Sequence, residues 1–246
     1  LNMFNFQKSI QKSFLLNTPK DIDFRKLATS EPLKINFKNF LGSECGRFDV
    51  KYNNTNFECL LIDSNVKRLF VCFSAAGRKK QDTLFQRLGW CRQLNGICLY
   101  IEDPMYKENK GLECGWFYGT EKESYLVHVN KIIEKILQER SINSQDVVFL
   151  GSSSAGYAAL YSANLLQGSI AYAYNPQITP KNWLDADNFQ RITKINLDGQ
   201  DAFNRKSLKN IAENNKSKFL IFYNLASKHD QKQFNPWFDE LGIKKN

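Results

Sequence analysis

The sequence predicts an α/β fold, a three-layer sandwich in which helices cover both faces of a mostly parallel central sheet. Two observations support this prediction. Short and almost uninterrupted apolar runs recur along the chain, as expected for strands that are buried on both faces. Segments with apolar residues at helical spacing lie between these runs, and this alternation is typical of α/β sandwiches.

The N-terminal region differs from this alternating pattern. Residues 1–40 have weak periodicity and are expected to form a peripheral segment. Residues 47–52 and 57–62 read as strands, and the sequence Asn-Asn-Thr-Asn between them predicts a turn. We therefore expect an antiparallel hairpin before the parallel part of the sheet.

The remaining elements follow in order along the chain. Strands are predicted at 69–73, 97–101, 147–150, 170–174 and 219–223, and helices at 82–94, 122–140 and 155–167. The polar stretch 178–217 is expected to form a cap or loop insertion, so that residues 1–246 make up a single domain.

Composition limits the class of protein. A chain of 246 residues with 42% hydrophobic content can bury one sizeable core. No apolar stretch is long enough for a transmembrane helix, and the N-terminus is too polar for a signal peptide, so we expect a cytoplasmic protein. The net charge of +9 is spread along the chain and no nucleic-acid-binding motif occurs, which favours an ordinary solvated basic surface. The alternative is that this charge attracts an anionic substrate or the inner face of a membrane.

The cysteines do not indicate a metal site. None of the six forms a Cys-x-x-Cys pair, and the ligand spacings of zinc sites are missing. We therefore interpret the cysteines as reduced and structural, and expect no metal.

The strongest chemical signal is the segment Gly-Ser-Ser-Ser-Ala at 151–155, between an apolar run and a predicted helix. Ligands of open α/β sheets bind at the carboxyl ends of strands, which is where these hydroxyls are expected. Alignment with G-x-S-x-G makes Ser153 the central nucleophile, with Gly151 and Ala155 as the small residues that the sharp turn needs. The alternative is that the serines only cap the helix. The combination of strand, turn and helix favours a nucleophile elbow.

This elbow resembles that of the α/β-hydrolase superfamily, and the wider chain resembles bacterial capsular-polysaccharide biosynthesis proteins of that fold, some of which are polysaccharide O-acetyltransferases. The matching pieces are VCFSAAG (71–77), DPMY (103–106), GWFYGT (115–120), FLGSSSAGYAAL (149–160) and NPQ (175–177). Ala155 departs from the pattern, which more often has glycine at that position.

The resemblance implies an α/β-hydrolase-like sandwich and acyl-group chemistry on a surface glycan through a Ser-His-Asp triad. It also implies an oxyanion hole formed by the backbone amides of Ser154 and of a residue near Ala75. No phosphate-binding or adenine-binding motif is identifiable, so acetyl-CoA as acyl donor is implied by the resemblance alone, and no bound cofactor is expected.

The chain has two histidines that could act as the general base of the triad. His128 lies in the predicted helix 122–140 and is interpreted as a core or surface residue. His229 lies after the run 219–223, on a predicted loop, and it follows Ser153 as the superfamily order Ser, acid, His requires. We therefore predict His229 as the general base.

One departure leaves an alternative open. In the superfamily the acid usually follows this strand and the histidine follows a further strand, but no further apolar run occurs after Tyr223. Either the histidine has moved to this loop, or Asp230 is the acid and the base lies beyond residue 246. If His229 is the base, the acid is Asp230, Asp198 or Asp201, and the sequence does not select among them.

Three hypotheses about function follow. The first is acetyl transfer through an acyl-enzyme on Ser153 to a hydroxyl of a capsular or related anionic glycan, with Trp116 and Tyr118 as candidate sugar-binding residues. The second keeps the same site but gives the acyl group to water, as a carbohydrate esterase does. The third is a non-catalytic glycan-binding or assembly protein on a decayed hydrolase fold.

Overall fold

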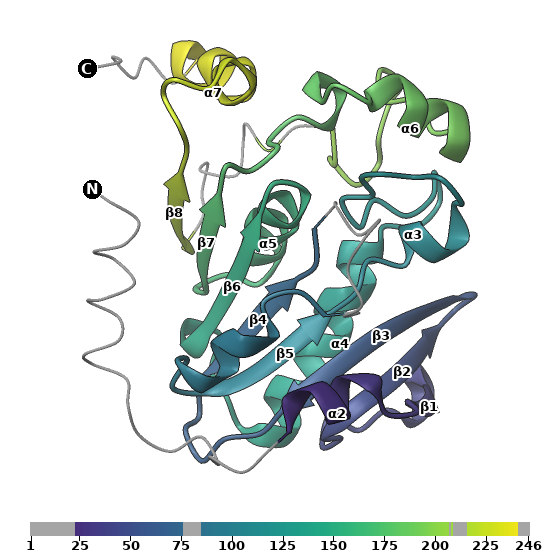
Figure 1. Ribbon diagram of the computed structural model, residues 1–246, viewed down its shortest axis with the longest axis vertical. Coiled ribbons are helices and arrows are strands. Elements are labelled where there is room, and N and C mark those ends of the chain that lie inside the picture. Colours follow the sequence, from purple (N-terminus) through teal and green to yellow (C-terminus); the bar gives the residue numbers. More distant parts are fainter. Residues whose placement is uncertain (1–22, 76–84, 207, 209–215, 241–246) are drawn as a thin grey trace.

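A computed structural model describes residues 23–75, 85–206, 208 and 216–240 of the chain. Its centre is an eight-stranded sheet with the order β1-β2-β3-β5-β4-β6-β7-β8 (Figure 1). The strands are β1 (Leu33–Asn36), β2 (Gly46–Tyr52), β3 (Thr55–Ile62), β4 (Leu69–Phe73), β5 (Ile97–Ile101), β6 (Val147–Ser152), β7 (Ile170–Tyr174) and β8 (Lys218–Phe222).

The sheet is mixed, with its parallel part around the predicted elbow. Strands β5, β4, β6, β7 and β8 run parallel to one another, whereas β3 is antiparallel to both β2 and β5. The predicted N-terminal hairpin is therefore present as β2 and β3, which pair from Gly46↔Leu61 to Tyr52↔Thr55. Strand β1 extends this edge in parallel with β2, so part of the segment 1–40 joins the sheet.

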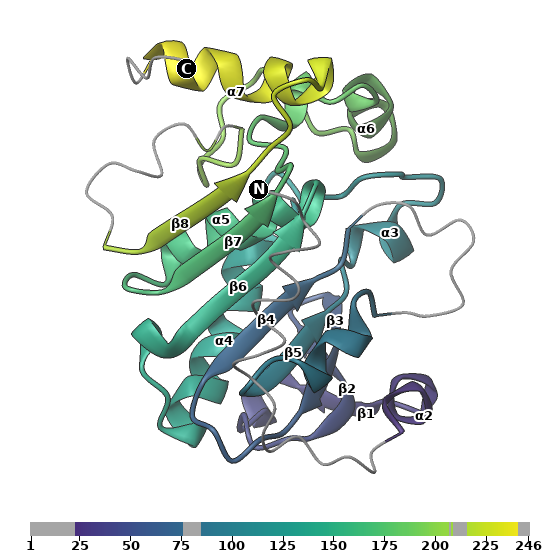
Figure 2. The same ribbon diagram turned by 60° about the vertical axis from the view of Figure 1, so that its left-hand side comes forward.

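Helical elements lie on both faces of the sheet, as the three-layer prediction requires (Figure 2). On one face α4 and α5 pack together over a large apolar core. On the other face α2 and the short helix η2 cover a second cluster that includes Leu60 and Tyr100. The helices are α2 (Phe24–Thr29), α3 (Met105–Glu108), α4 (Tyr125–Arg140), α5 (Ser154–Leu165), α6 (Ala186–Thr193) and α7 (Lys228–Glu240), with 3-10 turns η1 (Phe37–Asn39), η2 (Leu88–Arg92), η3 (Ser144–Asp146) and η4 (Pro180–Asn182).

Two of these helices lie beyond the carboxyl ends of the parallel strands. Helix α6 comes after β7, inside the stretch 178–217 that the sequence assigns to a cap, and α7 comes after β8. Both are seen above the strand ends in Figures 1 and 2. The residues that follow β5, β6, β7 and β8 thus meet at one edge of the sheet, which is where a site is expected.

One predicted helix is wrong. Of the segment 82–94, residues 82–84 lie outside the described part of the chain, and the rest forms only the 3-10 helix η2. The residue before η2, Arg87, has the left-handed φ of 59°, which a continuous α-helix does not allow. The helix predicted at 122–140 begins at Tyr125, and the one predicted at 155–167 runs from Ser154 to Leu165.

Two further observations concern the whole described chain. All six cysteines are free thiols, and all except Cys45 are buried. Among the described residues, no helix combines the length and the apolar character needed to cross a membrane.

Candidate active site at the elbow after strand β6

Ser153 occupies the sharp turn between β6 and α5. Its backbone has φ 56° and ψ −125°, a conformation that a residue with a side chain rarely adopts. The turn is tight because a Cβ on Gly151 would lie 2.0 Å from the carbonyl oxygen of Ala155, so only glycine fits there. A Cβ on Gly156 would lie 2.8 Å from Cβ of Pro176, which places the helix close to the next loop. These are the local features of a nucleophile elbow.

The serine side chains have partners other than the helix end. Ser153 is the N-cap residue of α5, yet its side chain forms no capping hydrogen bond. The hydroxyl of Ser152 instead accepts a hydrogen bond from the guanidinium of Arg87. Helix capping therefore does not explain the hydroxyls of Ser152 and Ser153.

The partner of the Ser153 hydroxyl is Gln177. Its Nε2 donates to Ser153 Oγ at 3.0 Å. On the other side of the amide, Oε1 accepts from Trp116 Nε1 at 2.6 Å and from Cys114 Sγ at 3.2 Å. Gln177, Trp116 and Cys114 are all buried. Sequence reasoning assigned no role to Gln177, although the residue belongs to the matching piece NPQ.

The predicted base lies at the same edge of the sheet but forms no hydrogen bond with Ser153. His229 is in the first turn of α7, not on a loop as predicted, and its ring packs edge-on against Trp183 with centroids 4.9 Å apart. Its Nδ1 is buried and has no hydrogen-bond partner among the described residues.

The predicted acid, Asp230, is buried beside His229 but is bound by other groups. Its carboxylate accepts from the backbone N–H of Asn224 at 2.8 Å, from the Ser227 hydroxyl at 3.3 Å and from the side-chain amide of Asn175. Asn175 and Gln177 are two residues apart, so the loop after β7 contacts the predicted acid with one side chain and the predicted nucleophile with the other.

The two other candidate acids are paired with cations. Asp198 forms an exposed ion pair with Lys181. Asp201 forms a buried ion pair with Arg205, at 2.8 Å between Oδ1 and Nη2. Burial alone would raise the pKa of Asp201, but the hydrogen bonds and the charge of Arg205 outweigh this effect and hold the pKa below its ordinary value of 3.8.

The two predicted oxyanion amides are placed differently. Ser154 is the first residue of α5, where backbone N–H groups have no acceptor within the helix. The N–H of Ala75 donates to Gln86 Oε1 at 3.0 Å, and Gln86 Nε2 donates back to the Ala75 carbonyl at 2.9 Å. In this structure the Gln86 side chain therefore occupies the Ala75 N–H that was predicted to bind the oxyanion.

The two aromatic residues predicted to bind sugar are buried: Trp116 is 0% exposed and Tyr118 is 1% exposed. Trp116 touches the site through Gln177. Tyr118 packs under Arg205, whose guanidinium carbon lies 4.2 Å from the ring centroid, and it borders a cavity of about 700 Å³. The other residues that line this cavity are Glu121, Ile195, Asn196, Gly199, Gln200, Asp201, Ala202 and Arg205.

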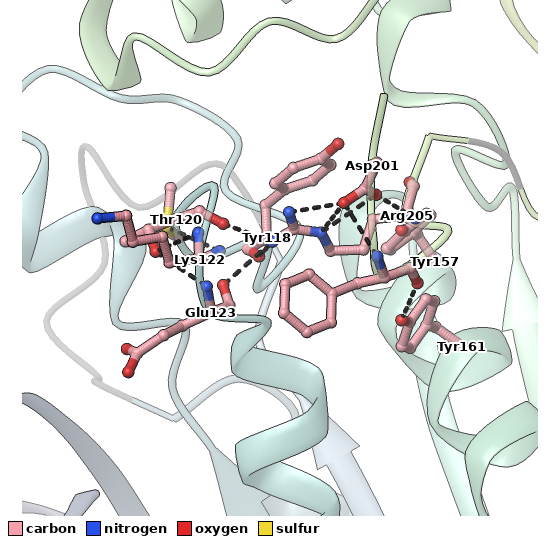
Figure 3. A network of polar contacts seen from close by, with 11 residues as sticks. Tyr118, Thr120, Lys122, Glu123, Tyr157, Tyr161, Asp201 and Arg205 are labelled. Atoms are coloured by element: carbon pink, nitrogen blue, oxygen red, sulfur yellow. Dashed lines mark hydrogen bonds and ion pairs between the residues drawn. The ribbon is translucent and has the colours of Figure 1, made fainter. Parts of the chain in front are cut away.

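Arg205 also joins two segments that are far apart in the sequence (Figure 3). Its Nη1 donates to the carbonyls of Thr120 at 2.9 Å and Glu123 at 3.1 Å, and also to that of Tyr118. The loop before α4 is thereby attached to the segment that follows α6. Within the described residues, no three His, Cys, Asp or Glu side chains are grouped as metal ligands.

No protein-family model and no curated protein matches this sequence. Solved structures do match. The chain is similar to the capsule O-acetyltransferase of Neisseria meningitidis serogroup A, with 18% identity, a TM-score of 0.58, and coverage of 84% of this chain and 86% of that one. A mutant of that enzyme in complex with CoA matches with the same TM-score of 0.58, at 17% identity and with 85% and 89% of the two chains covered.

An esterase structure matches almost as well. It is an S-formylglutathione hydrolase from Agrobacterium tumefaciens, with 15% identity, a TM-score of 0.55 and 82% of each chain covered. The sheet order, the elbow and these likenesses together show that the chain has an α/β-hydrolase fold and resembles capsule polysaccharide O-acetyltransferases in structure.

Proposed function

We propose that this chain is a serine acyltransferase that moves an acetyl group from a thioester donor to a hydroxyl of a bacterial capsular or surface polysaccharide. The observation that carries the proposal is the backbone of Ser153, with φ 56° and ψ −125° at the end of β6 and no capping bond from its side chain. Residues with strained backbone of this kind cluster at active sites. The likeness to a capsule O-acetyltransferase supports the choice of reaction.

The proposed reaction has two steps. In the first, Ser153 Oγ attacks the thioester carbonyl while the base takes the hydroxyl proton, and the thiolate leaves with that proton, so that the acetyl group is esterified to Ser153. In the second, the base takes a proton from a glycan hydroxyl, whose oxygen attacks the ester carbonyl. The bond between the acetyl carbon and Ser153 Oγ then breaks, and the base returns the proton to Oγ, so that the acetylated glycan leaves and the free serine is restored.

We assign the role of base to His229 and the role of acid to Asp230. Both lie at the carboxyl end of β8, and the loop after β7 connects Asp230 with the elbow through Asn175. In this structure His229 is hydrogen-bonded neither to Ser153 nor to Asp230, whose carboxylate is bound by Asn175, Asn224 and Ser227. Catalytic hydrogen bonds are often long or poorly aligned before substrate binds, so the assignment requires both bonds to form in the complex with substrate. Asp198 and Asp201 are weaker candidates because each is paired with a cation.

Charge and structural likeness suggest the substrates. The chain carries a net charge of +9, which favours both an anionic donor and a polyanionic glycan. A neighbouring structure was solved with CoA, so acetyl-CoA is the donor that we propose. We propose that the glycan is acetylated before it leaves the cell, which would place the protein in the cytoplasm, at the inner face of the membrane.

A second candidate is hydrolysis at the same serine, which the likeness to an S-formylglutathione hydrolase supports. The two reactions differ only in whether a sugar hydroxyl or water attacks the acyl-enzyme.

The test is to incubate the purified chain with acetyl-CoA and a panel of capsule oligosaccharides, and to measure acetylated glycan, free CoA and acetate by mass spectrometry. We expect acetylated glycan, and covalent labelling of Ser153 by a fluorophosphonate probe. Ser153→Ala should lose both signals, and His229→Ala should lower the rate by roughly 10²–10⁴-fold. The matched control is Ser152→Ala, which removes the neighbouring hydroxyl and should keep both signals.

Each alternative has a distinct result. Acetate without acetylated glycan would identify an esterase. A folded chain whose Ser153 is never labelled, and which still binds the glycan, would identify a binding protein. Full activity of His229→Ala would show that the base lies elsewhere.

A further inference from the structure

We propose that the side-chain amide of Gln177 is a donor of the oxyanion hole, acting together with the backbone amide of Ser154. This inference rests on the proposed acyl chemistry at Ser153. It concerns the group that stabilises the negative charge on the acyl oxygen when Ser153 Oγ attacks.

The orientation of the Gln177 amide is fixed by its neighbours. Trp116 Nε1–H can only donate, and it lies 2.6 Å from Gln177 Oε1. The carbonyl end of the amide must therefore face Trp116, and the NH₂ end must face Ser153 Oγ, 3.0 Å away. This assignment follows from the hydrogen-bond network and does not depend on telling nitrogen from oxygen.

The NH₂ group of Gln177 has a hydrogen to spare. One of its two hydrogens is used in the bond to Ser153 Oγ, and no second acceptor for Nε2 lies among the described residues. An acyl oxygen that develops on the Gln177 side of Ser153 Oγ would lie within hydrogen-bonding reach of this nitrogen, which is 3.0 Å from Oγ. Side-chain amides of Asn and Gln are known donors in oxyanion holes.

A second donor is needed because the predicted one is occupied. The N–H of Ala75 donates to Gln86 at 3.0 Å, whereas Ser154 supplies an N–H at the start of α5. Gln177 supplies the second donor beside Ser153 Oγ without any rearrangement of the Ala75 segment.

The position of Gln177 is also rigid, as an oxyanion donor requires. Its own N–H donates to the carbonyl of Ser153 at 3.2 Å, and the N–H of Ser153 donates to the carbonyl of Tyr174 at 2.9 Å. Pro176 packs on Gly156 at the start of the helix. The backbone on both sides of the amide is therefore attached to the elbow.

The test uses p-nitrophenyl acetate, an activated ester that needs no glycan acceptor, and compares the parent chain with Gln177→Glu and Trp116→Phe. Gln177→Glu keeps the shape and the acceptor for Trp116, and as an ionised carboxylate it has no hydrogen to donate. We expect kcat to fall by roughly 10²–10³-fold with KM little changed, because the bond to the oxyanion forms only in the transition state. Trp116→Phe leaves Gln177 in place but frees its orientation, and we expect a smaller loss of kcat.

Circular dichroism and thermal unfolding of each variant separate this effect from loss of the fold. A folded Gln177→Glu whose kcat stays within about threefold of the parent overturns the inference and leaves the proposed function intact. A parent that cleaves the ester but acetylates no glycan overturns glycan transfer and leaves the inference intact. A parent that leaves the ester uncleaved overturns the inference together with the serine chemistry.

Discussion

At the scale of single residues, the site depends on a serine held in an unfavourable backbone conformation. Ser153 has a positive φ of 56°, and an L-residue adopts such a conformation only where surrounding contacts impose it. Here the N–H of Ser153 is bonded to the last residue of β7 and its C=O to the loop that follows. Gly151 makes the conformation sterically possible, since the first turn of α5 occupies the space of its missing Cβ.

This dependence predicts the effect of one methyl group. In Gly151→Ala the new Cβ would lie 2.0 Å from Ala155 O, so the start of α5 must shift. We expect a loss of about 1–3 kcal/mol in the free energy of unfolding and a marked fall in probe labelling of Ser153. Urea unfolding and labelling rates measure the two effects.

Gly89→Ala is the matched control for this substitution. Gly89 lies in η2, its φ is not in the left-handed region, and nothing lies within 4 Å of a Cβ built there. The free energy of unfolding of the Gly89→Ala variant should stay within about 0.5 kcal/mol of that of the parent chain. If the two variants behave alike, the tight turn at Gly151 does not control the elbow.

At the scale of elements, one buried arginine joins the loop before α4 to the segment after α6. Arg205 is 2% exposed and bonds to Asp201 and to three carbonyls of the loop, as Figure 3 shows. The carbonyls and the carboxylate together replace the water that the guanidinium loses on burial. A buried cation with these partners is stable, but it becomes costly when its counter-charge is removed.

We therefore expect Asp201→Asn to lower the free energy of unfolding by about 3 kcal/mol, because it leaves the Arg205 charge buried without an anion. Asp198→Asn is the control, since Asp198 is paired with Lys181 at the surface and its loss should cost less than about 1 kcal/mol. Urea unfolding of both variants is the measurement. An Asp201→Asn chain that keeps its stability but loses acyl transfer would point instead to a role as the catalytic acid.

The elements themselves were predictable where burial alone decides them. Strands at 69–73 and 97–101 occur with the predicted bounds and are buried at every residue, as the unbroken apolar runs indicate. The strand at 170–174 also has the predicted bounds, but only Ala171 and Ala173 in it are fully buried. The prediction of a helix at 82–94 was wrong for a reason that cannot be seen in the spacing of the apolar residues. Arg87 turns into the left-handed region, and its guanidinium reaches the Ser152 hydroxyl across the sheet edge.

The site was predictable only in part for the same reason. The elbow is a local motif, so its conformation could be read from the glycine and the serines that form it. The contact between Gln177 and Ser153 depends on how the loop after β7 folds over the elbow, whereas the sequence indicates only that two strand ends lie near each other. The helical position of His229 and the partners of Asp230 are likewise tertiary features.

At the scale of the whole molecule, the hairpin at the sheet edge is attached to the helical layer through His128. This residue of α4 is buried, stacks on Tyr52 with ring centroids 4.3 Å apart, and meets Phe57 edge-on at 6.0 Å. Its Nδ1 has no hydrogen-bond partner among the described residues. The sequence left open whether His128 is a core or a surface residue, and these contacts place it in the core.

These surroundings make the stability of the fold depend on pH. Burial lowers the pKa of His128 below its ordinary value of 6.5, and the charge of Glu123 opposes this effect only in part. Below pH 6.5 the unfolded chain therefore takes up a proton at this position more readily than the folded chain, so the free energy of unfolding falls as the pH drops towards the folded-state pKa. Above pH 6.5 both states are neutral at His128, and this contribution to stability is fully present.

His128→Phe tests this prediction, because phenylalanine keeps an aromatic ring between Tyr52 and Phe57 but cannot be protonated. Urea unfolding at about pH 7.5, 6.5 and 5.5 should give a free energy that declines more steeply for the parent than for the variant, with a limit of about 1.4 kcal/mol per pH unit for a single proton. At neutral pH the variant should be at least as stable as the parent, because it removes a buried nitrogen that has no partner among the described residues. Equal slopes for the two chains would mean that His128 is protonated as easily in the folded state as in the unfolded one, and that the hairpin is less tightly packed on α4 than the ring contacts indicate.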